Sequence, residues 1–308
     1  MSADGPSQRR ALFLAVLSNL LGGSAYFAIE QALRVWPPSA LVFVRVLLSI
    51  PLFMIVTPRG SFSHALPADY GRILLVGSIG FAGPLLVSAH GLVHSDSSHG
   101  AILIGIEPVV LVLMARLFLG ESMTRSQVVS IGLALTGAII VVSDGRLGDM
   151  FELKGSALGN LMLAATALLW GIYTIAAKPT LARVSAPAFC SSTGVIAAVC
   201  VLPFAVPEAR ALDLERMIEP LSLLALGYLV LGVSFGAVMT WNLALKSIPA
   251  SRMAVLVLLQ PVTGVLLGVV AGEPTTLAKI VGAVFVFLAI WLSTRPPRPN
   301  SEVHSRTE

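Results

Sequence analysis

The chain has 308 residues, of which 56% are hydrophobic and only 12% are charged, and its mean hydropathy is +0.88. A soluble domain carries about 25% charged residues, so the composition excludes a soluble protein and indicates a polytopic membrane protein. The formal net charge is +4. The basic residues lie at the ends of apolar segments and not on one face, which argues against a nucleic-acid partner.

Apolar segments of about 20 residues cross a bilayer as helices. Such segments follow one another along the whole chain, separated by short, turn-rich breaks, and no extramembrane domain is expected. We predict ten spans, over residues 11–29, 40–57, 70–91, 98–119, 125–143, 155–177, 186–206, 219–244, 250–271 and 276–294. The first apolar run has no clean cleavage box and is interpreted as an uncleaved span.

Two segments that lie far apart in the chain carry the same pattern. The segments are residues 101–121 and 254–273. Each has a proline in mid-span, Pro108 and Pro261, and each ends in a Gly-Glu step. A repeat of this kind usually reveals the architecture of a protein. Each half would hold five spans, an odd number, so the two halves must insert in opposite orientations.

We therefore predict an all-α membrane protein built from two inverted five-helix repeats around a central cavity. The first repeat covers residues 1–148 and the second covers 149–294, while the Pro-rich polar tail, 295–308, is expected to be disordered and cytoplasmic. With the N-terminus inside, Lys and Arg in the inner loops outnumber those outside by about two to one. This bias places both termini in the cytoplasm.

Glu107 is the only acid deep within a predicted span, where an ionised carboxylate costs about 2.5–3.5 kcal/mol. One interpretation makes it a proton site or a partner for a substrate ammonium. The other is structural: its carboxyl group would bind backbone groups that are freed where Pro108 interrupts the helix. The equivalent residue in the second half is Gln260, which cannot titrate and so favours the structural role.

Two basic side chains near span ends also have two interpretations each. His90 is expected either to bind a substrate carboxylate or act as a pH gate in the cavity, or to reach the outer interface beside His94 and His99. Arg45 is expected to extend outward to the interface. Its alternative role is an ion pair with Glu30 that closes the outer side.

Polar and aromatic side chains in mid-span are the remaining candidates for a substrate site. Trp170 and Tyr173 flank Gly171 in the sixth span, away from the interfacial aromatic belts, so they are expected to line the cavity. Glycines at such places allow kinks or close helix contact. The predicted substrate-binding residues are Trp170, His90, Tyr173, Tyr26, Asn19, Asn242 and Gln260, and the predicted hinge residues are Pro108, Pro261, Gly22, Gly23 and Gly171.

The sequence contains none of the motifs of common catalytic or cofactor sites. It has no P-loop, no HExxH, no Cys/His metal spacing and no GxSxG elbow. We therefore predict a protein that is not an enzyme and that uses no cofactor or metal.

The chain resembles the drug/metabolite transporter superfamily, in particular its EamA-type ten-helix members. The residues that carry the resemblance are Leu169-Trp170-Gly171, Phe43-Val44-Arg45, Glu107-Pro108, Gln260-Pro261 and the two Gly-Glu turns. The resemblance implies two inverted five-helix halves, with a cavity framed by spans one, three, four, six, eight and nine and with spans five and ten at the periphery. Within the family, the chain is most similar to bacterial exporters of amino acids, including the aromatic type.

We therefore expect a secondary transporter of a bacterial inner membrane that exports amino acids and similar amphipathic metabolites by alternating access, through facilitated diffusion. The alternative is a proton-coupled exporter of drugs or other metabolites on the same fold. The expected partners are the small-molecule substrate and membrane lipid. Monomer and homodimer both remain open.

Overall fold

The structure is a computed structural model that describes residues 6–94, 107–121, 125–143, 157–270 and 276–294. Within these residues it consists of helices and turns, with no strand, as expected for an all-α membrane protein. The predicted tail, the boundary between the halves and the second Gly-Glu step lie outside the described residues.

The helices follow the predicted spans, and several run a few residues further at one or both ends. The first half contains α1 (Pro6–Leu33), α2 (Pro38–Ile55), α3 (Pro67–Leu75), η1 (Val76–Ala82), α4 (Gly83–His94), α6 (Glu107–Leu119) and α7 (Arg125–Ser143). The second half contains α8 (Ala157–Leu181), α9 (Ala186–Glu208), η3 (Ala209–Ala211), α10 (Leu214–Met217), α11 (Pro220–Tyr228), η4 (Leu229–Ala237), α12 (Val238–Leu245), α13 (Ala250–Val257), α14 (Leu259–Val270) and α15 (Leu277–Thr294).

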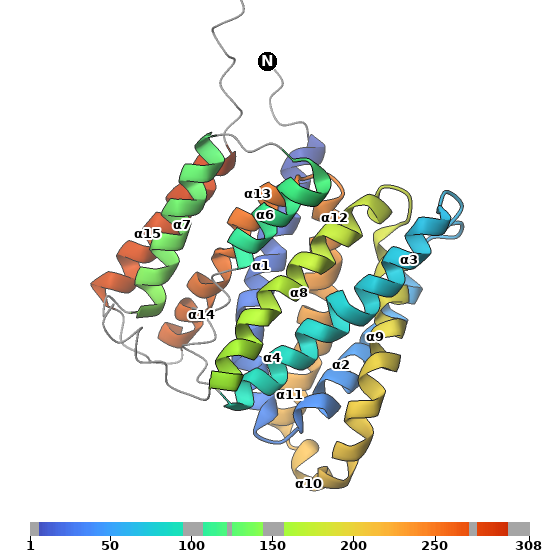
Figure 1. The fold of residues 1–308 in the computed structure, drawn as a ribbon. Coiled ribbons are helices and arrows are strands. Elements are labelled where there is room, and N and C mark those ends of the chain that lie inside the picture. Colours follow the sequence, from blue (N-terminus) through green and yellow to red (C-terminus); the bar gives the residue numbers. More distant parts are fainter. Residues whose placement is uncertain (1–5, 95–106, 122–124, 144–156, 271–275, 295–308) are drawn as a thin grey trace, which may run out of the picture.

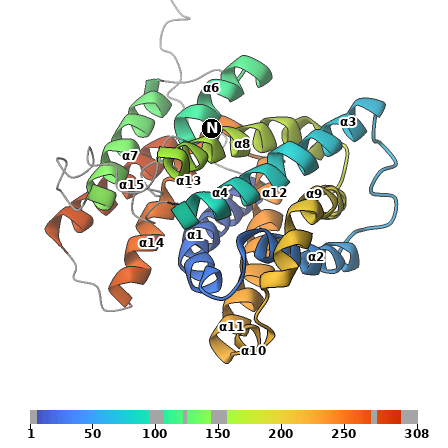
Figure 2. The same ribbon diagram turned by 60° about the horizontal axis from the view of Figure 1, so that its bottom comes forward.

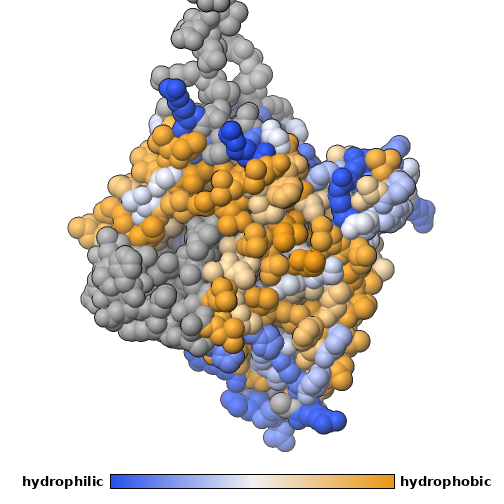
Figure 3. Space-filling view, in the orientation of Figure 1, coloured by the Kyte–Doolittle hydropathy of each residue, from blue (hydrophilic) through white to orange (hydrophobic). Residues whose placement is uncertain are grey.

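Six helical stretches in the described part of the chain are long and apolar enough to cross a membrane, and three shorter apolar helices accompany them. A broad apolar surface lies between two hydrophilic ends of the molecule (Figure 3). Exposed leucine, phenylalanine and isoleucine side chains on this surface, such as Leu117, Phe118 and Ile55, suit contact with lipid tails. The chain is a multi-pass membrane protein.

The third span of each half contains a π-helical stretch at its centre. In the first half η1 joins α3 to α4, and in the second half η4 joins α11 to α12. Two glycines explain how η1 packs so closely: a Cβ at Gly77 would lie 2.6 Å from the Ile196 Cβ, and one at Gly80 would lie 2.9 Å from the Tyr173 Cα. Neither contact leaves room for a side chain, so η1 meets α8 and α9 almost backbone to backbone.

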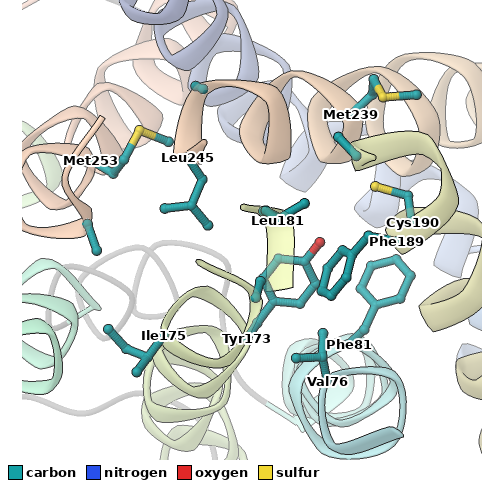
Figure 4. Close-up of a cluster of buried hydrophobic side chains, with 14 of the residues drawn as sticks. Val76, Phe81, Tyr173, Ile175, Leu181, Phe189, Cys190, Met239, Leu245 and Met253 are labelled. Carbon is teal, nitrogen blue, oxygen red and sulfur yellow. The ribbon is translucent and has the colours of Figure 1, made fainter. Parts of the chain in front are cut away.

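The main core forms where α8, η1, α9, α12 and α13 meet (Figure 4). Tyr173 of α8 lies at its centre, and only 1% of this residue is exposed. The rings of Phe81 and Phe189 lie 6.0 and 6.3 Å from the Tyr173 ring, between centroids, and Phe189 meets it edge to face. Such aromatic pairs add about 0.5–1.5 kcal/mol beyond their burial, so Tyr173 is held firmly.

One pair of helices lies apart from this core. α7 packs mainly against α15 at the edge of the molecule, as Figures 1 and 2 both show. The two helices approach closely, because a Cβ at Gly137 would lie 2.6 Å from the carbonyl oxygen of Gly282. This agrees with the expectation that spans five and ten are peripheral.

Candidate functional site

A cavity of about 130 Å³ lies between helices of the two halves. One water needs roughly 10–15 Å³ on this scale, so the cavity has room for a molecule on the order of ten non-hydrogen atoms. α1, α2, η1, α4 and α6 contribute to its walls from the first half, and α8, η4, α12 and α14 contribute from the second. The lining residues are Ser18, Gly22, Ala25, Ile29, Arg45, Phe81, Leu85, Ser88, Glu107, Thr166, Trp170, Tyr173, Thr174, Val233, Ala237, Val238, Trp241 and Gln260.

Aromatic rings form one wall of the cavity. The ring centroids of Trp170 and Tyr173 are 5.5 Å apart, and the two rings meet edge to face. The ring centroid of Phe81 lies 6.3 Å from that of Trp170. Trp241 lines the cavity as well. These rings offer large apolar contact areas and have few rotatable bonds. Their side chains therefore lose little conformational entropy when a substrate packs on them.

Asn242 supports this wall from behind. It is fully buried and does not line the cavity, but its Nδ2 donates a 2.5 Å hydrogen bond to the Tyr173 hydroxyl and a 2.8 Å bond to the Val238 carbonyl. The sequence analysis predicted Asn242 as a substrate-binding residue, but in the structure it positions Tyr173 and does not line the cavity.

A second polar pair lies where α1 meets α14. Gln260 lines the cavity, and its Nε2 donates a 3.0 Å hydrogen bond to Asn19 Oδ1, while Asn19 Nδ2 donates to the Ala15 carbonyl at 2.8 Å. Asn19 is buried behind Gln260. A Cβ at Gly23 would lie 2.6 Å from the Gln260 carbonyl oxygen, whereas one at Gly22 would meet the Gln260 side chain at 3.4 Å. Gly23 thus allows the helices to touch, and Gly22 leaves space in the cavity.

Pro261 lies in the first turn of a helix that follows a break in its span. The ninth span breaks at Leu258, between α13 and α14, and Pro261 follows three residues later. Proline has no N–H group, so it cannot continue the helical hydrogen bonds across this break. Pro108 is the second residue of α6. Gly171, by contrast, marks a close contact, because a Cβ there would lie 2.7 Å from the Met114 Sδ of α6.

Glu107 lines the cavity beside Pro108 and is 7% exposed. Its carboxyl group makes no hydrogen bond or ion pair with any residue that the structure describes. The bonds to freed backbone groups, which would have supported a structural role, are therefore not found in this part of the chain. Its counterpart Gln260 also faces the cavity, so the two equivalent positions contribute one polar group each from opposite halves.

His90 lies outside the cavity lining, which corrects the expectation that it would lie in the cavity with Trp170. Its Nε2 is 2.9 Å from Ser39 Oγ, at the start of α2, and 3.9 Å from Glu208 Oε1, at the end of α9. The Glu208 carboxylate accepts hydrogen bonds from the backbone N–H groups of Ser39 and Ala40, at 2.8 and 3.0 Å. Helix N-termini favour such anions. His90 and Glu208 therefore link the two halves at one end of the bundle.

Two further carboxylates tie the halves together elsewhere. Asp69 of α3 accepts two hydrogen bonds from Arg183, Nε to Oδ2 at 2.7 Å and Nη2 to Oδ1 at 2.6 Å, and a third from Thr180 at 3.1 Å. Glu121 accepts bonds from the backbone N–H groups of Ala250 and Ser251, both at 2.9 Å, at the start of α13. The Gly-Glu step explains the second tie, because Gly120 has a φ of +65° and turns the chain sharply after α6.

The sequence led us to expect Arg45 to extend outward to the interface, but it lies in the wall of the cavity, with 5% of the residue exposed. Glu30, its alternative partner, pairs instead with Arg34 at 3.6 Å on the exposed side of α1. The signal for a functional Arg45 was present in the sequence, since it is the only charged residue of its predicted span.

Of the predicted substrate-binding residues, the cavity therefore brings together Trp170, Tyr173 and Gln260, together with Gly22 and the possible proton site Glu107. Asn19 and Asn242 lie one layer behind, and His90 lies elsewhere. The side chain of Tyr26 is outside the described part of the structure. Sequence reasoning did not select Arg45, Phe81, Ser18, Ser88 or Thr174, all of which line the cavity.

Comparisons with known proteins agree with a transporter. The sequence profile of the EamA-like transporter family matches residues 9–143 and again residues 157–295. The probable terminal-alkyne amino-acid exporter of Streptantibioticus cattleyicolor is 28% identical over 278 residues, covering 89% of this chain and 90% of that protein. The aromatic amino acid exporter YddG of Ancylobacter novellus is 29% identical over 168 residues, covering 54% of this chain and 55% of that protein.

A solved crystal structure supports the fold. It superimposes with a TM-score of 0.73 and covers 92% of this chain and 96% of its own, at 19% sequence identity. The family profile covers nearly all of the described helices, once in each half. From this match, the apolar helices and the cavity between them, we conclude that the chain belongs to the EamA-like transporter family and is a multi-pass membrane transporter.

Proposed function

We propose that this transporter exports amino acids and similar small amphipathic metabolites from the cytoplasm. The observation that carries the proposal is the cavity itself, which combines an aromatic wall with few charged groups and has room for about ten non-hydrogen atoms. An amino acid offers the matching features: a small body, an apolar side chain and a polar head. Relatives named as amino-acid exporters support the same class of substrate.

Transport proceeds by alternating access between two inverted repeats, residues 1–148 and 149–294. The family profile matches once in each of these ranges, and the π-helical stretches η1 and η4 occupy corresponding places in them. Both termini face the cytoplasm, as the distribution of basic residues favours. In this arrangement the substrate binds between the repeats and the repeats rock around it.

Transport needs no coupling ion, and the flux is facilitated diffusion. Support comes from the residue equivalent to Glu107 in the other half. This residue is Gln260, a neutral amide that also lines the cavity. The second candidate is a proton-coupled exporter of drugs or other metabolites. It is favoured by one observation, the Glu107 carboxyl group, which faces the cavity without a hydrogen bond to any described residue.

The test is uptake of a panel of labelled amino acids into proteoliposomes that contain the purified protein, with no imposed ion gradient. We expect saturable uptake that is lost in Trp170→Ala. Phe287→Ala is the matched control, because Phe287 is an exposed aromatic residue of the peripheral helix α15, and it should transport normally. Uptake that appears only after a proton gradient is imposed would favour the second candidate. Uptake by neither route would refute amino-acid transport.

A further inference from the structure

Arg45 is a buried cation without a partner in the described structure. It lies on α2, it is 5% exposed, and it forms part of the cavity wall. Its Nε is buried and has no hydrogen-bond acceptor among the residues that the structure describes. None of the ion pairs between described residues includes it. Arg45 is therefore a buried cation in the cavity wall that has no partner among the described residues.

Two other buried or half-buried charges in this protein have hydrogen-bond partners, unlike Arg45. Asp69 accepts hydrogen bonds from Arg183 and Thr180, and the Lys178 ammonium donates to the carbonyl groups of Leu245 and Ile248, at 3.0 and 2.6 Å. A buried charge that lacks such partners is strongly unfavourable, and within a membrane it marks a functional site. The missing acceptor for Arg45 is then expected to come from a ligand in the cavity.

The chemistry of the site selects the kind of anion. A guanidinium presents its donors in a planar fork, which matches the two oxygens of a carboxylate. Among the described lining residues, Arg45 is the only cation. Its single positive charge matches the single negative charge of a carboxylate. A phosphate group carries nearly two negative charges, which Arg45 would not balance.

We propose that Arg45 binds the carboxylate group of the transported substrate, while the aromatic wall around Trp170 receives its apolar part. The inference rests on the proposed function and deepens it, because it names the group by which an amino acid is recognised. It makes a free carboxylate a requirement for binding. Amines of the same size and shape that lack the carboxylate are therefore excluded.

The experiment uses the purified full-length chain in proteoliposomes and measures the uptake of labelled L-phenylalanine. Two unlabelled competitors separate the ends of the substrate: 3-phenylpropionate keeps the carboxylate, and phenethylamine keeps the amine. We expect 3-phenylpropionate to inhibit uptake at least tenfold more strongly than phenethylamine. Arg45→Met should reduce uptake at least tenfold, and Arg45→Lys, which keeps the charge but not the fork, should reduce it less. Arg34→Met, at an exposed arginine that follows the last residue of α1, should leave uptake unchanged.

The thermal unfolding midpoint in detergent separates a role in binding from a role in folding. Loss of an unpaired buried charge should leave the midpoint of ligand-free Arg45→Met equal to the wild type or higher. The wild-type midpoint should rise with 3-phenylpropionate and not with phenethylamine, and this rise should be absent in Arg45→Met. A lower midpoint of the ligand-free variant would show a structural role and overturn the proposal.

The remaining outcomes distinguish this inference from the proposed function. If the wild type takes up phenylalanine and both competitors inhibit equally, or if Arg45→Met keeps the rise with 3-phenylpropionate, carboxylate binding by Arg45 is wrong and amino-acid transport stands. If the wild type takes up no amino acid but shows the rise and Arg45→Met does not, the carboxylate site stands and amino-acid transport is wrong. If uptake and the rise are both absent, both proposals are wrong.

Discussion

The backbone of Gly80 in η1 lies directly against the backbone of Tyr173 in α8, so closely that a Cβ on Gly80 would come within 2.9 Å of the Tyr173 Cα. This contact joins the third span of the first half to the first span of the second half. It also fixes the distance between Phe81, which follows Gly80, and the rings of Trp170 and Tyr173. One missing side chain therefore sets the geometry of the aromatic wall.

Gly80→Ala should lower the stability of the protein and weaken substrate binding. The added methyl group meets backbone atoms, which cannot rotate away, and overpacking of this kind costs about 1–3 kcal/mol. The measurement is the thermal unfolding midpoint in detergent, together with the KM for uptake. Gly132→Ala in α7 is the control, because a Cβ there meets nothing within 4 Å, and its midpoint should be unchanged or higher. Equal midpoints for the two variants would contradict the contact.

Two neighbouring glycines of α1 should respond in different ways to the same substitution. Gly23→Ala places a methyl group 2.6 Å from the Gln260 carbonyl oxygen, so it should push α1 from α14 and lower the unfolding midpoint. Gly22→Ala meets only the Gln260 side chain, at 3.4 Å, so it should fold normally and reduce uptake of bulky substrates more than of small ones. A lower unfolding midpoint for Gly22→Ala than for Gly23→Ala would show instead that Gly22 is the contact residue.

Asp69→Asn should destabilise the protein strongly. The Asp69 carboxylate is buried and accepts two hydrogen bonds from Arg183. An Asn side chain has one acceptor oxygen and no charge, so the ion pair and one of these hydrogen bonds are lost. Glu30→Gln is the matched control, since Glu30 and Arg34 pair with more than half of each side chain exposed. Exposed pairs contribute about 0–1 kcal/mol. Unfolding midpoints of the two variants, compared with the wild type, test the difference.

Glu107→Gln should retain phenylalanine flux in the absence of a gradient. The substitution makes the first half resemble the second, where Gln260 occupies the equivalent place in the cavity. The measurement is the initial rate of uptake across an external pH range of about 6 to 8, which should be flat for both proteins. A wild-type protein that accumulates substrate with an imposed proton gradient, and a folded variant that does not, would identify Glu107 as the proton site.

The sequence predicted the class of fold and the order of the helices well, because hydrocarbon imposes a strict rule on composition. Each apolar segment had to be a helix, since only a helix satisfies its own backbone in lipid. The peripheral place of α7 and α15 was also expected, from the family resemblance. The π-helical stretches were not, because a change from one helical hydrogen-bond pattern to another leaves the apolar character of the segment unaltered.

The site was harder to predict than the fold. Trp170, Tyr173 and Gln260 were found because polar tips stand out within apolar spans, but the direction in which each side chain points depends on the packing of its helix. His90 and Arg45 show the difficulty in opposite senses. Both lie near span ends in the sequence, yet His90 joins Ser39 and Glu208 at one end of the bundle, and Arg45 turns inward to the cavity. Distance along a span does not reveal this choice.

The π-helical stretches η1 and η4 have a consequence for motion. The hydrogen bonds of a π-helix join residues five apart, one residue more than in an α-helix, and one residue of an α-helix corresponds to about 100° of rotation around the axis. If η1 rewound into α-helix, α4 would rotate about its axis relative to α3, and Leu85 and Ser88 would leave the cavity wall. The same change in η4 would carry Trp241 of α12 away. The register of two short segments, one in each half, therefore determines which side chains a substrate meets.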